Sequence, residues 1–378
     1  MKKFVKFVSA AMAVALAVVC FASCSSNQVF KKDTWNIGCT GPLTGDAASY
    51  GISVQKGATI AIEEINAAGG LNGYLFAFDM KDDKAEAADA ATGYDTLFEA
   101  GMQVSLGSVT SGSCKSFAAK AAQDNVFFIT PSASEEAVIQ YGDNAFRVCF
   151  GDPDQGTLAA DQIKADGYTN VGVIYETSSS YSAGVFDAFK AEAEKIGLEY
   201  KLATFDGENN KDFSSQVETL KDCDIFFMPF YYTEASLVAK AATAKGVNAV
   251  LFGVDGFDGI DAMFTKDDVI NNKILYITPF DAESTDPTVS KFVAAYKAKY
   301  NETPDQFAAD GYDSVMAIYN AMKKADVKDV NISASDLCNL LKAAITASDF
   351  SYTGATGTMT WATSGACTKV PQIKEMKR

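Results

Sequence analysis

The sequence predicts an α/β protein whose chain folds into two Rossmann-like lobes, each built on a parallel sheet flanked by helices. Short apolar runs alternate with longer amphipathic runs along most of the chain, which is the pattern of βαβ units. Several apolar runs are continuous, as in "VFFIT" (126–130) and "IFFM" (225–228), which is typical of strands buried on both faces. One sheet holding all these strands would be unusually large, so we expect two.

The first set of units precedes Arg147. Its strands are expected where short apolar runs stop at small or polar residues, and its helices where apolar residues recur with helical spacing. The predicted strands are 35–40, 75–80, 104–106 and 126–129, and the predicted helices are 55–67, 85–99 and 115–123.

A second, similar set runs from Gly156 to about Phe280. The same two patterns alternate here, so a second parallel sheet is expected. The predicted strands are 171–175, 200–204, 225–228, 250–252 and 274–277, and the predicted helices are 156–166, 183–195, 213–220 and 234–244.

Helices dominate after Phe280, with candidates at 289–300, 305–323 and 334–347, followed by a short terminal strand at 358–361. These helices must pack on a lobe that has already formed, so the chain is expected to cross between the lobes more than once. Ligands of open parallel sheets bind beyond the carboxyl ends of the strands, which places a site in the cleft between the lobes.

The first residues have the composition of an export signal. Three lysines precede the apolar run 7–21, and Ala22-Ser23-Cys24 follows it. This arrangement resembles a bacterial lipobox, so we expect residues 1–23 to be a lipoprotein signal peptide, Cys24 to be lipidated and 24–33 to be a tether. The alternative is an ordinary signal peptide with an incidental cysteine.

Composition excludes several classes of function. Without residues 1–23 the net charge is 29 minus 48, or −19, which repels nucleic acid. The chain contains no histidine, so catalysis by a Ser-His-Asp or Cys-His set is excluded and the commonest metal ligand is missing. No cysteines have zinc or redox spacing, and Cys39, Cys149 and Cys223 are expected to be small buried hydrophobic residues. We expect no cofactor and no metal.

Two clusters of small hydroxyl residues follow successive predicted strands, at 108–113 ("SVTSGS") and 130–134 ("TPSAS"). Serine is a preferred N-cap residue, so either cluster alone is consistent with a plain helix cap. Helix N-termini with hydroxyl groups also bind small anions such as a carboxylate. Both readings remain open from the residues alone.

Four further stretches carry a family resemblance: "GCTGPLTGDAASYG" (38–51), "GATIAIEEINAAGGLNG" (57–73), "FRVCFGDPDQG" (146–156) and "KDFSSQVETLKDCDIFF" (211–227). With the hydroxyl clusters, they resemble the leucine/isoleucine/valine-binding protein family over almost the full mature length. These are type 1 periplasmic-binding-fold receptors of ABC transporters. The resemblance implies a Venus-flytrap fold with three crossover segments between its lobes.

The resemblance also assigns roles to particular residues. It implies that Ser111 and the segment Ser132-Ala133-Ser134 hold the ligand's charged groups from the first lobe, and that Asp255 in the second lobe faces the ammonium. Many family members carry glutamate at the position of Asp255. Further implied contacts are the aromatic residues Tyr181 and Tyr231, which close over the ligand, and a side-chain pocket lined by Tyr50, Val109 and Phe307.

The function expected on this basis is that of an extracytoplasmic solute-binding lipoprotein. It would bind a branched-chain or other apolar amino acid, act as a monomer with a membrane permease, and contact the membrane only through its lipid. The expected lobes are 34–150 with 281–346, and 151–280 with 347–378. The alternative is a sensor of the same fold for another small ligand, such as an amide or an aromatic acid. A carboxylate-dependent glycosidase is a third reading, which the solvated pattern of acidic pairs such as Asp82-Asp83 disfavours.

Overall fold

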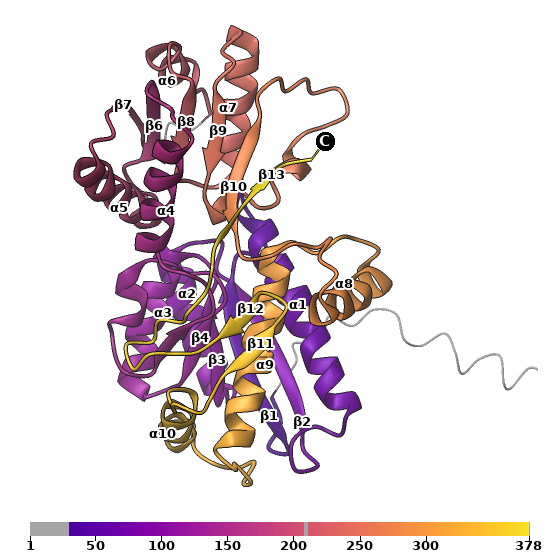
Figure 1. Cartoon of the computed structure of the whole chain (residues 1–378). Coiled ribbons are helices and arrows are strands. Elements are labelled where there is room, and N and C mark those ends of the chain that lie inside the picture. Colours follow the sequence, from indigo (N-terminus) through magenta and orange to yellow (C-terminus); the bar gives the residue numbers. More distant parts are fainter. Residues whose placement is uncertain (1–29, 208–210, 378) are drawn as a thin grey trace, which may run out of the picture.

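The computed structural model describes residues 30–207 and 211–377. The expected signal peptide and its Cys24 therefore lie outside the described residues. The chain forms two α/β lobes, one above the other in Figure 1, with the helices packed around the sheets.

The first lobe is built on a five-stranded sheet in the order β2-β1-β3-β4-β5, in which all neighbouring strands are parallel. Its strands are β1 (Thr34–Gly41), β2 (Leu75–Asp82), β3 (Val104–Ser108), β4 (Phe128–Thr130) and β5 (Ala145–Arg147). Its helical elements are α1 (Ala48–Ala67), α2 (Ala87–Glu99), α3 (Ser111–Asp124) and the 3-10 turn η1 (Glu136–Ile139), joined later by α8 (Pro287–Tyr300), α9 (Gln306–Lys324) and α10 (Ala334–Ile345).

The second lobe contains a six-stranded sheet in the order β13-β10-β9-β8-β6-β7, parallel except where β13 runs antiparallel to β10. Its strands are β6 (Val171–Glu176), β7 (Tyr200–Phe205), β8 (Ile225–Met228), β9 (Val250–Gly253), β10 (Ile274–Thr278) and β13 (Gln372–Glu375). Its helical elements are α4 (Asp152–Ala165), α5 (Ser180–Ile196), α6 (Ser214–Thr219), α7 (Tyr232–Lys245) and the 3-10 turns η2 (Asp255–Phe257) and η3 (Ile260–Met263). All four residues of β8 are buried, which confirms the prediction from "IFFM".

Each helix predicted by residue range is present, a helix expected to begin at Ser134 is reduced to the 3-10 turn η1, and the predicted strands of both sheets form. Sequence reasoning missed β5, β13 and part of a small hairpin of β11 (Tyr352–Gly354) and β12 (Gly357–Met359). β12 overlaps the strand predicted at 358–361. The missed strands are three or four residues long, and β13, at a sheet edge, has a single apolar residue, Ile373, among polar and charged ones, so none of them shows a long apolar run.

The chain passes between the lobes three times: from β5 to α4, from β10 to α8, and from β12 to β13. The hairpin β11-β12 packs against α8 and α9 of the first lobe. The third crossing therefore lies after residue 359, later than the boundary at 347 that the sequence suggested.

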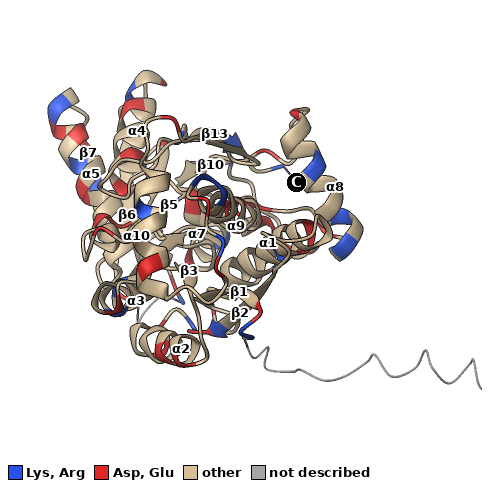
Figure 2. Ribbon diagram, turned by 90° about the horizontal axis from the view of Figure 1, so that it is seen from below, with Lys and Arg blue, Asp and Glu red and all other residues tan. Residues whose placement is uncertain are grey.

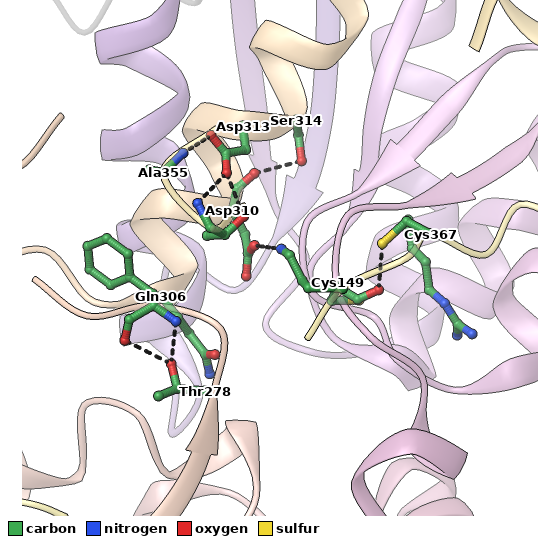
Figure 3. Close-up of polar contacts among 12 residues, drawn as sticks. Cys149, Thr278, Gln306, Asp310, Asp313, Ser314, Ala355 and Cys367 are labelled. Atoms are coloured by element: carbon green, nitrogen blue, oxygen red, sulfur yellow. Dashed lines mark hydrogen bonds and ion pairs between the residues drawn. The ribbon is translucent and has the colours of Figure 1, made fainter. Parts of the chain in front are cut away.

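Buried polar contacts fix this last crossing to the first lobe (Figure 3). Lys369 forms an ion pair with Asp310 of α9 (2.6 Å), and the two side chains are 1% and 3% exposed. The hairpin that precedes the crossing is held as well, because the carboxylate of Asp313, one turn further along α9, accepts the backbone N–H of Ala355 in its turn (2.8 Å). The thiol of Cys367 donates to the carbonyl of Cys149 in the first crossing (3.3 Å). Two of the three crossings therefore lie side by side.

Helix α9 approaches α1 so closely that two glycines are required between them. A Cβ atom on Gly57 of α1 would come within 1.8 Å of the carbonyl oxygen of Ala308. A Cβ atom on Gly311 of α9 would come within 2.5 Å of the carbonyl oxygen of Val54. The N-terminus of α9 is thereby held next to the first turns of α1.

The surface carries many charged residues, and five of the six described cysteines are buried. Figure 2 shows acidic and basic residues interspersed on the outer helices, with basic residues visible on α8 and acidic ones on α2. Cys39, Cys149 and Cys223 are buried, as the sequence predicted, and the six described cysteines form no disulfide. Within residues 30–207 and 211–377, no helix has the length and apolar content needed to cross a bilayer.

Candidate ligand-binding site

One wall of the site consists of the hydroxyl-bearing loops that follow β3 and β4. These strands are parallel neighbours, so the loops at their carboxyl ends lie side by side. The hydroxyl of Ser132 donates to the carbonyl of Val109 (2.9 Å), which joins one loop to the other. The hydroxyl of Ser111 accepts the backbone N–H of Glu135 (3.3 Å). The two clusters therefore form one continuous wall.

These hydroxyls do not act as plain helix caps. Thr110 is the N-cap residue of α3 but makes no side-chain capping bond, and Ser111 is already the first helical residue. The second cluster leads into η1, a single 3-10 turn whose N-cap is Glu135, instead of the helix expected after Ser134. Of the two clusters, therefore, the first leads into a full α-helix, α3, whose N-terminus presents free N–H groups and the positive end of its dipole to the site.

The facing wall comes from the second lobe and is centred on Asp255. This residue follows β9, begins η2 and is 5% exposed. The hydroxyl of Tyr181, from the first turn of α5, donates to the carboxylate of Asp255. The backbone N–H of Gly256 donates to the same carboxylate oxygen (2.9 Å). Asp255 is thus oriented by two donors.

Burial changes the acidity of this carboxyl group. Removal from water raises the pKa of Asp255 to about 6, although the hydroxyl of Tyr181 and other nearby donors lower it in part. A cation placed beside the carboxylate favours its ionised form. Asp255 is therefore suited to hold a buried positive group at neutral pH.

Aromatic residues from both lobes close the space between the two walls. The ring of Tyr50, on α1, lies 4.5 Å from the ring of Phe307 and 5.2 Å from that of Tyr231, centroid to centroid. The hydroxyl of Tyr50 donates to the carbonyl of Gly256 across the cleft (2.5 Å). Tyr181 and Tyr231 stack with a centroid distance of 5.1 Å. This part of the site is apolar and aromatic.

The walls surround a pocket between the two lobes. It is lined by Tyr50, Val109, Thr110, Ser111, Ser132, Tyr181, Tyr231, Asp255, Gly256 and Phe307. Eight of the ten residues assigned from the sequence are thus brought together around one space. Ala133 and Ser134 lie just outside it, both fully buried, and Thr110 and Gly256 were not anticipated.

The pocket lining carries no positively charged side chain. No lysine or arginine is among its lining residues, so an anionic ligand group can bind there only to uncharged N–H and O–H donors. The described residues contain no cluster of three or more side chains suited to a metal ion. The nearby cation of Arg147 is engaged elsewhere, donating to the carbonyl of Ser134 (2.8 Å) and to Glu136 (2.5 Å).

Sequence reasoning gave no role to three polar residues next to the pocket. The side-chain oxygen of Gln155 accepts the backbone N–H of Asp255 (2.9 Å). Asp152 lies one turn before Gln155 on α4 and is 1% exposed, and Gln306 reaches the site from the start of α9. The stretch "FRVCFGDPDQG" carried the signal for Asp152 and Gln155, because it was singled out as a family motif although its individual residues were not interpreted.

Comparison with known proteins places the sequence among binding proteins. Residues 34–366 match the periplasmic binding protein family. The chain is 29% identical over 322 residues to the leucine-, isoleucine-, valine-, threonine-, and alanine-binding protein of Pseudomonas aeruginosa, which covers 83% of this chain and 84% of that protein. It is 27% identical to Leu/Ile/Val-binding protein homolog 3 of Brucella melitensis, covering 78% of this chain and 80% of that protein.

Solved structures share the whole architecture. The branched-chain amino acid transporter substrate-binding protein LivJ of Streptococcus pneumoniae, solved with isoleucine, superposes with a TM-score of 0.80 and 29% identity over 90% of this chain and 95% of that one. A solute-binding protein from R. palustris, solved with benzoate, has the same TM-score with 20% identity over 91% of this chain and 93% of that one. The second similarity shows the fold alone.

Proposed function

Since the chain belongs to the periplasmic binding protein family, we propose that it binds a free amino acid with an apolar side chain in the pocket between its lobes. This family comprises binding proteins, and the chain is not an enzyme. The relative that is 29% identical is named for binding leucine, isoleucine, valine, threonine and alanine, and the one that is 27% identical is named a Leu/Ile/Val-binding protein homolog, which supports the proposed ligand class.

The observation that carries the proposal is the separation of complementary groups across one small pocket. Hydroxyl groups and the N-terminus of α3 face it from the first lobe, and the buried carboxylate of Asp255 faces it from the second. A zwitterion needs donors for its carboxylate and an acceptor for its ammonium. Each charge-assisted hydrogen bond of this kind contributes about 1.5–3 kcal/mol. The rings of Tyr50, Tyr231 and Phe307 offer apolar surface for the ligand's side chain.

None of the described lining residues is a lysine or an arginine. The pocket therefore favours a ligand with a neutral side chain over one with an acidic side chain. An aromatic acid without an amino group is the second candidate, because the fold also occurs in a benzoate-bound solute-binding protein. Such a ligand would leave the carboxylate of Asp255 buried without a cation, which is costly. The amino acid is therefore preferred.

A thermal-shift screen tests this proposal. The chain without residues 1–23 is heated with each of the twenty amino acids and with benzoate. A ligand at 100 times its Kd stabilises the folded state by about 2.7 kcal/mol, and the stabilisation grows with the logarithm of its concentration, so the true ligand raises the unfolding midpoint further at each higher concentration. We expect shifts with apolar L-amino acids and none with glutamate, lysine or benzoate. A shift with benzoate alone would contradict the proposal.

We further propose that the protein delivers its ligand to the permease of an ABC importer as a lipid-anchored monomer outside the cytoplasmic membrane. The lipobox-like Ala22-Ser23-Cys24 and the type of relative support this assignment. Intact-mass analysis of detergent-extracted protein tests the anchor. A diacylglyceryl adduct is expected on the natural chain and not on Cys24→Ala, and a mature N-terminus other than residue 24 would contradict it.

We also propose the lobe assignment read from the sequence, with 34–150 and 281–346 in one lobe, and 151–280 in the other. The hairpin at 352–359 packs with the first lobe, so of 347–378 only the last segment, including β13, is proposed for the second. Limited proteolysis with and without ligand tests this assignment, because protection on closure should concentrate at the three crossings.

A further inference from the structure

Two adjacent tyrosines, Tyr231 and Tyr232, have different surroundings at the cleft. Tyr231 lines the pocket, whereas Tyr232, the first residue of α7, does not. Tyr232 is 4% exposed, and its ring packs edge-on against the ring of Tyr50 on α1, with 4.7 Å between the centroids. Figure 1 shows α7 in the upper lobe and α1 in the lower lobe. Tyr232 therefore reaches from one lobe into the other without lining the pocket.

The N-terminus of α1 has no side-chain cap from its own N-cap residue. That residue is Ala47, which has no hydroxyl or carboxylate to accept a bond. In the first turn of α1, the N–H of Tyr50 donates to the carbonyl of Ala47 (3.2 Å). The N–H of Ser49, one residue earlier, donates instead to the hydroxyl of Tyr232 (3.3 Å). The opposite lobe therefore supplies a cap to α1.

The N-terminus of α7 is bonded in the reciprocal way. Its N-cap residue, Tyr231, makes no side-chain capping bond. The backbone N–H of Tyr232 donates to the hydroxyl of Tyr50 (3.1 Å), and this hydroxyl donates its own proton to the carbonyl of Gly256 (2.5 Å). The first N–H groups of a helix have no partner within that helix. Each of the two helices therefore supplies a tyrosine hydroxyl to the N-terminus of the other, across the cleft.

The hydroxyl of Tyr232 also bonds an anchored loop of the first lobe. It donates to the carbonyl of Asp46 (2.9 Å), which accepts the hydroxyl of Thr233 as well (3.0 Å). This loop is tied to the end of β2, because the carboxylate of Asp82 accepts the backbone N–H of Leu43 (2.8 Å). The tie lies entirely within the first lobe, so it does not depend on closure. The acceptor for Tyr232 is therefore held in place before the lobes meet.

We propose that Tyr232 is a positioning residue that holds the lobes closed, because its hydroxyl caps α1 from the opposite lobe and its backbone N–H orients the hydroxyl of Tyr50. These bonds form only when the lobes meet. Since Tyr232 does not line the pocket, its contribution to closure is the same whichever ligand is bound. Loss of its hydroxyl therefore weakens the binding of every ligand by a common factor. This inference rests on the proposed function and adds to it a residue that controls ligand release.

The alternatives are that Tyr232 contributes only to packing, or that it contacts the ligand directly. Tyr94 provides a matched control, because it is fully buried and its hydroxyl donates to Asp124 within the first lobe (2.9 Å). Tyr232→Phe and Tyr94→Phe each remove one hydroxyl and keep the ring. The experiment uses the chain without residues 1–23 and L-leucine, L-valine and L-alanine. Titration calorimetry gives each Kd, and stopped-flow fluorescence gives the dissociation rates.

We expect Tyr232→Phe to raise the Kd about fivefold or more, as for the loss of two hydrogen bonds, equally for all three ligands and through faster dissociation. Tyr94→Phe should change the Kd less than about twofold. Thr233→Val, which removes the other hydroxyl bonded to Asp46, should raise all three Kd values by a smaller common factor. Unchanged affinity in Tyr232→Phe, or an equal loss in Tyr94→Phe, would overturn the inference. Factors that differ between the ligands would overturn it in favour of direct contact.

Hydrogen exchange separates this inference from the proposed function, because the N–H of Ser49 depends on Tyr232 and not on a ligand. Without ligand, the peptide that contains Ser49 should exchange faster in Tyr232→Phe than in the natural chain, and at the natural rate in Tyr94→Phe. Equal exchange in Tyr232→Phe and the natural chain, both without ligand and with saturating L-leucine, would overturn the inference. If the natural chain binds none of the three amino acids, the proposed function fails, and the ligand-free exchange alone decides the role of Tyr232.

Discussion

The side-chain amide of Gln306 donates to the backbone carbonyl of Asp255 across the cleft, at 2.6 Å. Gln306 is the first residue of α9 in the first lobe, and Asp255 begins η2 in the second. The backbone N–H of Gln306 also donates to the carboxylate of Asp258 (2.9 Å). One residue of the first lobe therefore holds both ends of the turn that carries the proposed ammonium contact.

The first prediction follows from this bridge. Gln306→Ala removes one cross-cleft hydrogen bond, which contributes about 0.5–1.5 kcal/mol. We expect the Kd for L-leucine to rise about two- to tenfold, through faster dissociation, because the bond exists only when the lobes are together. Stopped-flow fluorescence measures both rates. Asn320→Ala is the control, since the amide of Asn320 bonds only within α9, to the carbonyl of Met316. A slower association rate with unchanged dissociation would contradict this role.

The second prediction concerns Asp255 and pH. Asp255→Asn keeps the size of the side chain but removes its charge, so we expect the affinity for L-leucine to fall by about 10- to 150-fold. The exposed residue Asp161 on α4 is a control, and Asp161→Asn should bind normally. In the natural chain the pKa of Asp255 is about 6 without ligand, and a bound ammonium favours its ionised form. Its contribution to affinity should therefore decrease as the pH falls below 6, and this decrease should be missing in Asp255→Asn.

The third prediction concerns a pair of acids at the cleft. Asp258 comes from the second lobe, and Asp305 caps α9 in the first through the N–H of Ala308 (2.8 Å). Burial is the main effect that raises the pKa of Asp258 to about 7, and repulsion by the charge of Asp305 adds to it. Burial also raises the pKa of Asp305 to about 6. Lys374 lowers the pKa of Asp258 and Asp261 raises both values.

The raised pKa values of Asp258 and Asp305 determine how the stability of the protein changes with pH. The unfolded chain releases these protons near its ordinary Asp pKa of about 3.9, so between about pH 4 and pH 7 the folded protein holds more protons. The contribution of this pair to stability is therefore present at low pH and is lost as the pH rises towards 7. We expect the ligand-free unfolding midpoint of the natural chain to exceed that of Asp258→Asn by more at pH 5.5 than at pH 8. A difference that grows with pH would contradict the assignment.

The fourth prediction concerns the third crossing. Burial lowers the pKa of Lys369, but the neighbouring groups Asp310, Cys367 and Asp313, of which Asp310 has the largest effect, together outweigh burial and raise it. Breaking a buried ion pair typically costs about 3–5 kcal/mol, so Lys369→Met should lower the unfolding free energy by about that much. Lys195→Met is the control, because Lys195 pairs with Glu192 at the surface with 74% of its side chain exposed. Its effect should stay below about 1 kcal/mol. Urea unfolding of both variants measures the difference.

Part of the site could be predicted because its residues follow strands. The hydroxyl clusters at 108–113 and 130–134 and the acid Asp255 come directly after apolar runs, and the carboxyl ends of parallel strands share one edge. Tyr50, Tyr181 and Phe307 have no such signal in their own pattern and were assigned only through the family resemblance. The pocket nevertheless brings all of them together.

Other residues could not be predicted from local pattern. Asp152 has the sequence signature of an acid in the first turn of a helix, and Gln306 that of a polar residue after an N-cap. Their importance arises from partners that are remote in the chain, since Gln306 meets Asp255 and Asp152 meets Ser134 only after folding. The expected helix after Ser134 shortened to a single 3-10 turn for the same reason: its first acid, Glu135, bonds Lys115 of α3 and Ser180 of α5.

The sequence by itself determined the α/β class, the positions of the helices and the main strands, the exclusion of histidine chemistry and the family. These properties depend on the spacing of apolar residues and on composition, which are local. Only the tertiary structure decided which polar atoms face one another across the cleft, where the third crossing occurs, and which acids are buried close enough to change their pKa. Those properties depend on distances between residues that can be more than 200 positions apart, and distance in space is set by packing and not by order in the chain.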